Sequence, residues 1–140
     1  MARTLRTAAV LYTLLLSWLL LAPDPLAIFG VAGSAAEEAV DWSLSGAVQH
    51  VGAFAVLSAL WCLSSVDQRG RVAAVVLSGF FGAAMELLQL LVPTRYCDWH
   101  DLLANLVGIA FGWTAARVVD ALAPAGVLSL SSAGDESAAP

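Results

Sequence analysis

The stretch from Met85 to Gly112, MELLQLLVPTRYCDWHDLLANLVGIAFG, decides the fold of this chain. It contains two apolar runs separated by a short polar segment that includes Pro93. Proline cannot continue a helix and disfavours helical geometry at the residue before it, so the first run is expected to end at Val92. Asp98 is then a typical N-cap for the second run, with another carboxylate, Asp101, three residues later. The stretch predicts two apolar helices joined by a polar corner.

The composition of the whole chain indicates a membrane protein. Of the 140 residues, 60% are hydrophobic and 12% are charged, and the mean hydropathy is +0.83. A soluble domain is closer to half apolar and a quarter charged. The length suits one small domain. The net charge is −5 and the six cationic residues, all arginines, form no basic cluster, so no nucleic-acid partner is expected.

Four apolar segments are long enough to cross a bilayer, which requires about 20 residues in helical form. They are expected at residues 4–22, 47–64, 72–92 and 100–122. Helices are the expected form because backbone polar groups in lipid must be satisfied within their own segment. The predicted fold class is therefore all-α, an integral membrane four-helix bundle.

The first segment has an alternative reading as a signal peptide, since Arg3 and Arg6 precede its apolar run. The run continues without a break to Pro23, however, and no cleavage site of the A-x-A type stands in a clear position. A retained membrane helix is therefore the favoured interpretation.

The arginines predict the orientation of the bundle. If the chain crosses the membrane four times, all of them except Arg95 fall on one side. These five are Arg3, Arg6, Arg69, Arg71 and Arg117. Cationic residues concentrate on the cytoplasmic side, so both termini are expected in the cytoplasm and the polar corner outside. Residues 1–122 are expected to form the membrane domain, and the small, polar segment 123–140 a disordered cytoplasmic tail.

The two cysteines are expected to be free thiols. Cys62 would lie near the inner end of the second helix and Cys97 in the outer corner. A disulfide needs Cα atoms within about 7 Å of each other, and most of the bilayer would separate these two.

Polar side chains of three helices are expected to meet near the outer face. At about 1.5 Å per residue, His50, Glu86 and Asn105 all lie within roughly 10 Å of the outer interface. Ionisable residues at that depth are costly and by default mark function. The alternative is a network in which Arg95 neutralises carboxylates and only stabilises the corner. The candidate ligand-binding residues are His50, Glu86, Gln89, Arg95, Asp98, Asp101 and Asn105.

Small residues extend the polar faces towards the middle of the membrane. Gly79 and Ala83 precede Glu86 at helical spacing, and Gly108 and Gly112 continue the face of the last helix. Small residues at four-residue spacing let membrane helices approach closely. They are expected to form a packing seam between the third and fourth helices.

The sequence supports neither a metal site nor a cofactor. His50, Glu86 and Asp101 could together offer three ligands, but no H-x-x-x-H or C-x-x-C spacing accompanies them. The hydrolase motif G-x-S-x-G does not occur either. No metal, no cofactor and no identified catalytic residue are therefore predicted.

At these positions the sequence resembles the VanZ-like family over residues 47–112. The matching strings are Glu86-Leu-Leu-Gln89, Pro93-Thr-Arg95, Asp98-x-x-Asp101-Leu-Leu-Ala-Asn105-x-x-Gly108 with Gly112, and, earlier, His50-x-x-x-Phe54-x-x-Leu57. There is one departure: the family often has an Asp-Lys pair before the histidine, where this chain has Gly46 and Ala47. If that lysine partners a carboxylate or an anionic ligand, Arg95 has to provide more of the positive charge here.

The resemblance implies a small multi-pass protein of the bacterial cytoplasmic membrane, in a family that is named for a protein associated with teicoplanin resistance and has no established reaction. The expected function is non-enzymatic. An outward-facing pocket is expected to bind the headgroup of an anionic membrane lipid or of a lipid-linked cell-wall precursor, with Arg95 as the anion contact. Through this binding the protein is expected to influence glycopeptide tolerance. One alternative is an enzyme acting on lipid-linked substrates, with Glu86, Asp101 and His50 as acid–base groups. Another is a small transporter or a subunit of a membrane assembly, and a homo-oligomer is left open.

Overall fold

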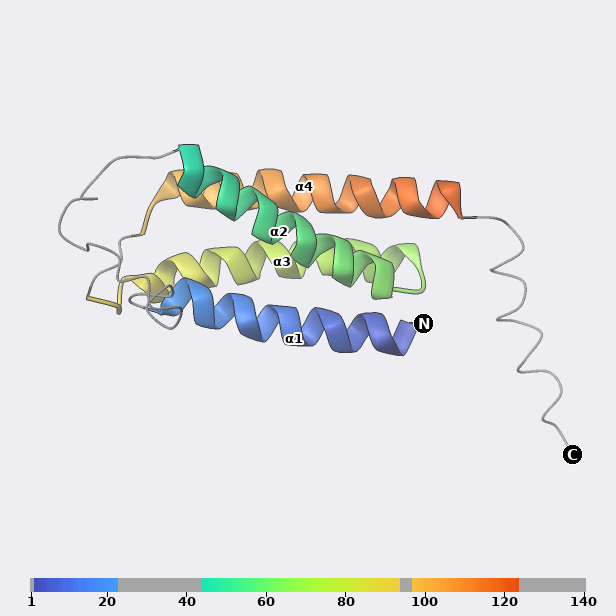
Figure 1. The fold of residues 1–140 in the computed structure, drawn as a ribbon, viewed down its shortest axis with the longest axis horizontal. Helices are drawn as coiled ribbons and strands as arrows, with labels where there is room; N and C mark the ends of the chain where they lie inside the picture. Colours follow the sequence, from blue (N-terminus) through green and yellow to red (C-terminus); the bar gives the residue numbers. More distant parts are fainter. Residues whose placement is uncertain (1, 23–43, 94–96, 124–140) are drawn as a thin grey trace, which may run out of the picture.

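The described residues of the computed structural model are 2–22, 44–93 and 97–123, and they form four α-helices (Figure 1). The helices are α1 (Ala2–Leu21), α2 (Leu44–Ser64), α3 (Gln68–Gln89) and α4 (Trp99–Leu122). Each is long and apolar enough to cross a membrane. The prediction of an all-α chain with four membrane-length helices is thereby confirmed. Arg95 and nearly all of the tail predicted at 123–140 lie outside the described residues.

Helix α3 begins four residues before the predicted start, for a local reason. Asp67 has an extended backbone and its side chain accepts a hydrogen bond from the backbone N–H of Gly70 at 2.8 Å. This is an N-cap, and it draws Arg69 and Arg71 into the first turn of the helix. A hydropathy window misses such a start because the first turn of α3 is polar.

The other end of α3 also differs from the prediction, because regular helix stops at Gln89 rather than Val92. The backbone N–H groups of Leu90, Leu91 and Val92 bond to carbonyls three residues back, at 3.2, 3.0 and 3.0 Å. Such bonds are typical of the tightened last turn of a helix. Pro93 therefore follows a tight turn, and the polar corner begins slightly earlier than expected.

Helices α2 and α3 each contact all three other helices, and the most extensive contact of the bundle is the one between α2 and α4 (Figure 1). Phe54 and Leu57 of α2 are fully buried and pack with Leu16 of α1 and Ile109 of α4. Large apolar side chains on the outer faces of the helices, such as Phe80, are exposed. An apolar exterior around a packed interior is the arrangement expected for a bundle surrounded by lipid.

The packing seam of Gly108 and Gly112 faces α2, and the prediction that it lies between α3 and α4 is wrong. A Cβ at Gly108 would overlap the backbone oxygen of Val51, and one at Gly112 that of Ala55. The hydroxyl of Ser58 also donates to the backbone oxygen of Ile109 at 3.1 Å across this contact. The absence of side chains at the two glycines therefore lets the backbones of α2 and α4 touch.

The small residues expected on α3 have a different role from those on α4. A Cβ at Gly79 would meet no atom of the described residues within 4 Å, so close packing does not require glycine there. Ala83 is half-buried. Gly82, which the sequence did not single out, is the glycine of α3 that packs closely against other helices. A Cβ there would lie 3.0 Å from the Phe54 ring and 3.3 Å from Nδ2 of Asn105.

The arginine-rich segments gather at one end of the bundle, where α1 begins, α2 joins α3 and α4 ends (Figure 1). Arg71 on α3 forms an ion pair with Asp120 on α4. Arg6 donates to the backbone oxygen of Ser64 at 3.4 Å, and Arg117 to Oε1 of Gln68 at 3.4 Å. These contacts join α1 to α2 and α3 to α4 at the arginine-rich end.

Both cysteines are free thiols, as predicted. Cys62 is buried near the arginine-rich end, where its thiol contacts the backbone oxygen of Arg71 at 3.9 Å. Cys97 is exposed and immediately precedes the N-cap of α4 at the opposite end.

Candidate functional site

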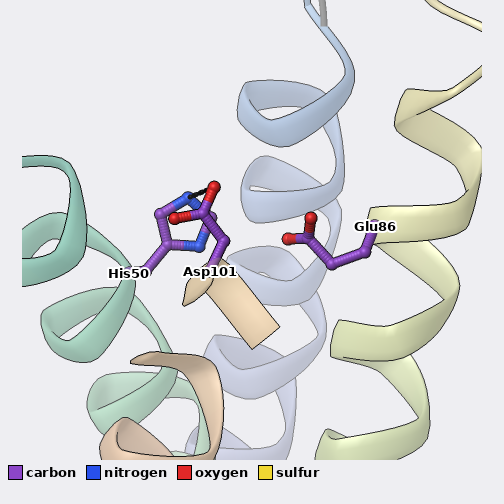
Figure 2. Close-up of side chains that lie close together, drawn as sticks. All are labelled: His50, Glu86 and Asp101. Atoms are coloured by element: carbon purple, nitrogen blue, oxygen red, sulfur yellow. Dashed lines mark ion pairs between the residues drawn. The ribbon is translucent and has the colours of Figure 1, made fainter. Parts of the chain in front are cut away.

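Three ionisable side chains from three helices converge near the end of the bundle opposite the arginines. His50 comes from the second turn of α2, Glu86 from the last turn of α3 and Asp101 from the first turn of α4. Figure 2 shows both carboxylates turned towards the imidazole ring. One donor atom of each residue lies within 4.8 Å of the other two. The Nε2 atom of His50 is 3.8 Å from Oδ2 of Asp101.

A buried amide positions the histidine. Oδ1 of Asn105, one turn further along α4, lies 2.9 Å from Nδ1 of His50. The carbonyl oxygen of an amide only accepts hydrogen bonds, so Nδ1 must carry the proton in this contact. In a neutral ring Nε2 then has the free lone pair, and this is the nitrogen that faces Asp101.

The innermost part of the cluster has unused hydrogen-bonding capacity. Glu86 is only 3% exposed and Asn105 only 1%. Oε2 of Glu86 accepts a long hydrogen bond, 3.4 Å, from the backbone N–H of Asp98. Oε1 of Glu86 and Nδ2 of Asn105 are buried and form no close hydrogen bond among the described residues, although the Asn105 amide lies near enough to interact with the Glu86 carboxylate. Most buried polar groups are hydrogen-bonded, and an orphaned one is costly.

Exposure increases from Glu86 and Asn105 towards the other two members of the cluster. The side chains of His50 and Asp101 are 15% and 27% exposed. A small polar molecule or an ion could therefore reach the cluster past His50 and Asp101, whereas Glu86 and Asn105 lie at its inner side.

Asp98 borders the cluster but acts as a helix cap. Its carboxylate accepts from the backbone N–H of His100 at 2.9 Å and contacts Nδ1 of the same residue at 2.8 Å. The backbone hydrogen bond from His100 holds the pKa of Asp98 below its usual value. The prediction that Asp98 caps α4 is confirmed, and its contribution to the cluster is its backbone N–H.

Gln89 does not join the cluster. Its side chain is buried, and Nε2 donates to the backbone oxygen of Leu20 at 3.2 Å, which ties α3 to α1. Arg95, the expected anion contact, is outside the described residues. Of the candidate residues, the structure brings together His50, Glu86, Asp101 and Asn105, with Asp98 at the edge.

The bundle also contains an apolar cavity that the sequence did not predict. Its volume is about 200 Å³, and Thr13, Trp61 and Phe81 of α1, α2 and α3 are among the lining residues. Such a cavity depends on how three helices pack together, which no local pattern reveals. Its lining suits a hydrocarbon group and offers no acid–base chemistry.

Four membrane-length helices with an ionisable cluster inside one end define a membrane-type helical protein. The chain belongs to the VanZ-like family, because the family model described as VanZ/LLP1 matches residues 9–120. This match extends beyond the resemblance over residues 47–112 and reaches from α1 to the end of α4. No curated protein and no solved structure is detectably similar to the chain.

Proposed function

We propose that the chain is a multi-pass protein of the bacterial cytoplasmic membrane with both termini in the cytoplasm. The distribution of arginines supports this orientation, since five of the six lie near the starts of α1 and α3 or the end of α4, which are at the same end of the bundle (Figure 1). Cationic residues of membrane proteins concentrate on the cytoplasmic side. The cluster of His50, Glu86, Asp101 and Asn105 then lies close to the outer face of the membrane.

The cluster binds the polar headgroup of an anionic lipid or of a lipid-linked cell-wall precursor, and it does so without catalysing a reaction. The observation that carries this proposal is the pair of buried, unpartnered atoms, Oε1 of Glu86 and Nδ2 of Asn105. One is an acceptor and the other a donor. A headgroup hydroxyl could donate to Glu86, while a phosphate or carbonyl oxygen could accept from Asn105.

Arg95 provides the positive charge for an anionic headgroup in this proposal. It lies between Pro93 and Asp98 in the sequence, in the connection that precedes the cluster on α4. Arginine binds phosphate and carboxylate groups through charge-assisted hydrogen bonds. Binding of a cell-wall precursor at this place would link the protein to glycopeptide tolerance.

A membrane enzyme acting on lipid-linked substrates is the second candidate. It is favoured by the orientation of His50, whose Nε2 faces Asp101 while Asn105 binds the other ring nitrogen. A histidine held in this way can act as a general base, with Glu86 as a second acid–base group. Formation of a new product from lipid extract by the purified protein would favour this candidate over binding alone.

The binding proposal can be tested by native mass spectrometry of the full chain in detergent. Phosphatidylglycerol, phosphatidylcholine and a lipid-linked cell-wall precursor are added in turn. We expect the precursor or phosphatidylglycerol to be retained in preference to phosphatidylcholine. Glu86→Gln should weaken retention, because the amide replaces an acceptor-only carboxylate.

The matched control is Asp98→Ser, which removes a carboxylate at the same end of the bundle but preserves an N-cap side chain for α4. It should retain lipid as the parent protein does. Equal retention of all three lipids, or an equal loss in Asp98→Ser and Glu86→Gln, would contradict a specific headgroup site.

A further inference from the structure

We propose that His50, Glu86 and Asp101 form a binding site for one divalent metal ion with the ligand preferences of Zn²⁺. The three donor groups are an imidazole nitrogen and two carboxylate oxygens, a set that Zn²⁺ accepts. Three protein ligands and an open fourth position are typical of catalytic zinc sites. From the sequence these three residues were possible ligands but no metal was predicted, because each comes from a different helix and no local spacing connects them.

The geometry needs only a small adjustment to hold an ion. The three donor atoms lie within 4.8 Å of one another, and His50 Nε2 and Asp101 Oδ2 are 3.8 Å apart. With bonds of about 2.0–2.2 Å, a tetrahedral Zn²⁺ places its ligand atoms about 3.5 Å apart. Rotation of the carboxylate side chains could supply the difference without movement of the helices.

The histidine already has the orientation and tautomer that a metal site requires. Metal-bound histidines usually donate their second ring N–H to an oxygen, which fixes the ring and makes the ligating nitrogen more basic. Here Nδ1 of His50 donates to Oδ1 of Asn105 at 2.9 Å. The lone pair of Nε2 is therefore available on the side where the carboxylates lie.

The charge of the cluster supplies a second, independent argument. Glu86 is 97% buried, since its exposed fraction is 3%, and its Oε1 has no hydrogen-bond partner in the described part of the chain. Among the described residues, neither Glu86 nor Asp101 forms an ion pair with an arginine. A buried carboxylate is costly unless it is paired or coordinates a metal. A divalent ion would balance both carboxylates and satisfy the unpartnered oxygen.

This inference goes beyond the headgroup proposal and does not depend on it, although an ion with an open position could also contact a phosphate. Because the ligands come from α2, α3 and α4, the ion would bind three helices to one another. Ligands that bind only the folded state raise its stability. Zinc is therefore expected to raise the unfolding temperature of the protein.

The experiment uses the full chain in detergent, treated with a chelator and then desalted. Zn²⁺ or Mg²⁺ is added, loosely bound ion is removed, and the metal content is measured by mass spectrometry beside thermal unfolding. We expect one Zn²⁺ per chain and a raised Tm with Zn²⁺, and neither effect with Mg²⁺. A wild-type protein that retains no Zn²⁺ and shows no change in Tm would overturn the proposal.

The variants are His50→Gln and Glu86→Gln, and the matched control is His100→Gln, which removes the only other histidine of the chain. The first two should lose about tenfold or more in Zn²⁺ affinity, at least as much as the loss of an outer-shell partner. His100→Gln should bind as the wild type does. Equal loss in all three variants, or full binding by Glu86→Gln, would overturn the assignment of these ligands.

A readout on the wild-type protein covers the case in which a variant does not fold. Co²⁺ in a four-coordinate site of nitrogen and oxygen ligands absorbs visible light, and Zn²⁺ should displace it at a ratio of one to one. Absence of that absorption would contradict the proposal. Lipid retention measured in the presence of chelator separates the two ideas. If the protein binds no metal but still retains lipid, the metal site is refuted and the headgroup proposal stands.

Discussion

Asn105 on α4 holds His50 on α2 through a contact of 2.9 Å between Oδ1 and Nδ1. The amide is almost completely buried, whereas the histidine side chain is 15% exposed. The contact joins the two helices at the place where the polar cluster opens, and it assigns the proton of the neutral imidazole to Nδ1. The tautomer of His50 is therefore determined by a side chain from another helix.

The first prediction concerns this tautomer. In metal-free protein at a pH where His50 is neutral, we expect the ¹⁵N shifts of its imidazole to report the Nδ1–H form. Asn105→Ala removes the acceptor, and the ring should shift towards the Nε2–H form or a mixture. His100 serves as an internal reference. The matched control is Gln89→Ala, which removes a buried amide that bonds to Leu20 and not to His50. A change of the His50 tautomer in that variant would contradict the conclusion that Asn105 determines it.

The second prediction concerns the glycines. A Cβ at Gly112 would overlap the backbone oxygen of Ala55, so Gly112→Ala should force α2 and α4 apart and cost roughly 1–3 kcal/mol, as overpacking usually does. Gly79→Ala is the matched control, because a Cβ there meets no described atom within 4 Å. It should be neutral or stabilising by up to about 1 kcal/mol, since alanine favours helix. Thermal unfolding in detergent measures both, and similar values for the two variants would contradict the α2–α4 seam.

The third prediction concerns orientation. Cys97 is exposed at the end expected outside, so a membrane-impermeant maleimide should label it on intact cells or spheroplasts. Cys62 is buried and should stay silent until the protein unfolds. Val66 is 83% exposed in the α2–α3 connection, at the other end of the bundle. A cysteine at this position therefore reports on the side of the membrane that is expected to be cytoplasmic. In a Val66→Cys, Cys97→Ser variant, labelling should require permeabilised membranes, and labelling of this variant on intact cells would reverse the orientation.

Local signals in the sequence predicted the parts of the fold that depend on local chemistry. Pro93 and Asp98 correctly placed the polar corner between two apolar helices, and the depth of His50, Glu86 and Asn105 correctly brought them to one level. The neighbour of each helix face was harder to predict, because periodicity defines a face without saying which helix covers it. The seam of Gly112 was therefore assigned to the wrong helix.

The same limit explains the outcome for the candidate site. By spacing, Gln89 shares a face of α3 with Glu86. Helix α1 covers the part of that face where Gln89 lies, however, and Gln89 donates to the backbone oxygen of Leu20 there. The sequence does not single out Gly82, because its importance comes from contacts with Phe54 and Asn105, on two other helices. A cluster made by three helices can be predicted in outline from depth, whereas its partners depend on tertiary packing.

The last prediction separates a structural corner from a ligand site, using Glu86. If the cluster served only to stabilise the corner, neutralising Glu86 would remove a favourable ion pair and lower stability. Among the described residues, however, Glu86 has no arginine partner, and one of its oxygens is buried without a hydrogen bond. Replacing a buried, poorly satisfied charge by a neutral side chain of the same shape is often neutral or stabilising. Glu86→Gln should therefore accumulate in the membrane at the parental level, with an equal or higher Tm when both proteins are measured free of metal.

The same variant should nevertheless fail to complement a deletion strain in an envelope phenotype such as glycopeptide sensitivity, because the carboxylate that would contact a ligand is gone. One alternative remains, in which Arg95 neutralises Glu86 and the pair only stabilises the fold. Arg95→Leu and the double variant Arg95→Leu, Glu86→Gln test it. Under that alternative each single variant is unstable and the double variant, which has neither charge, recovers both abundance and phenotype. We expect instead that the double variant is present in the membrane and does not complement, because a ligand site needs its charged groups even where the fold does not.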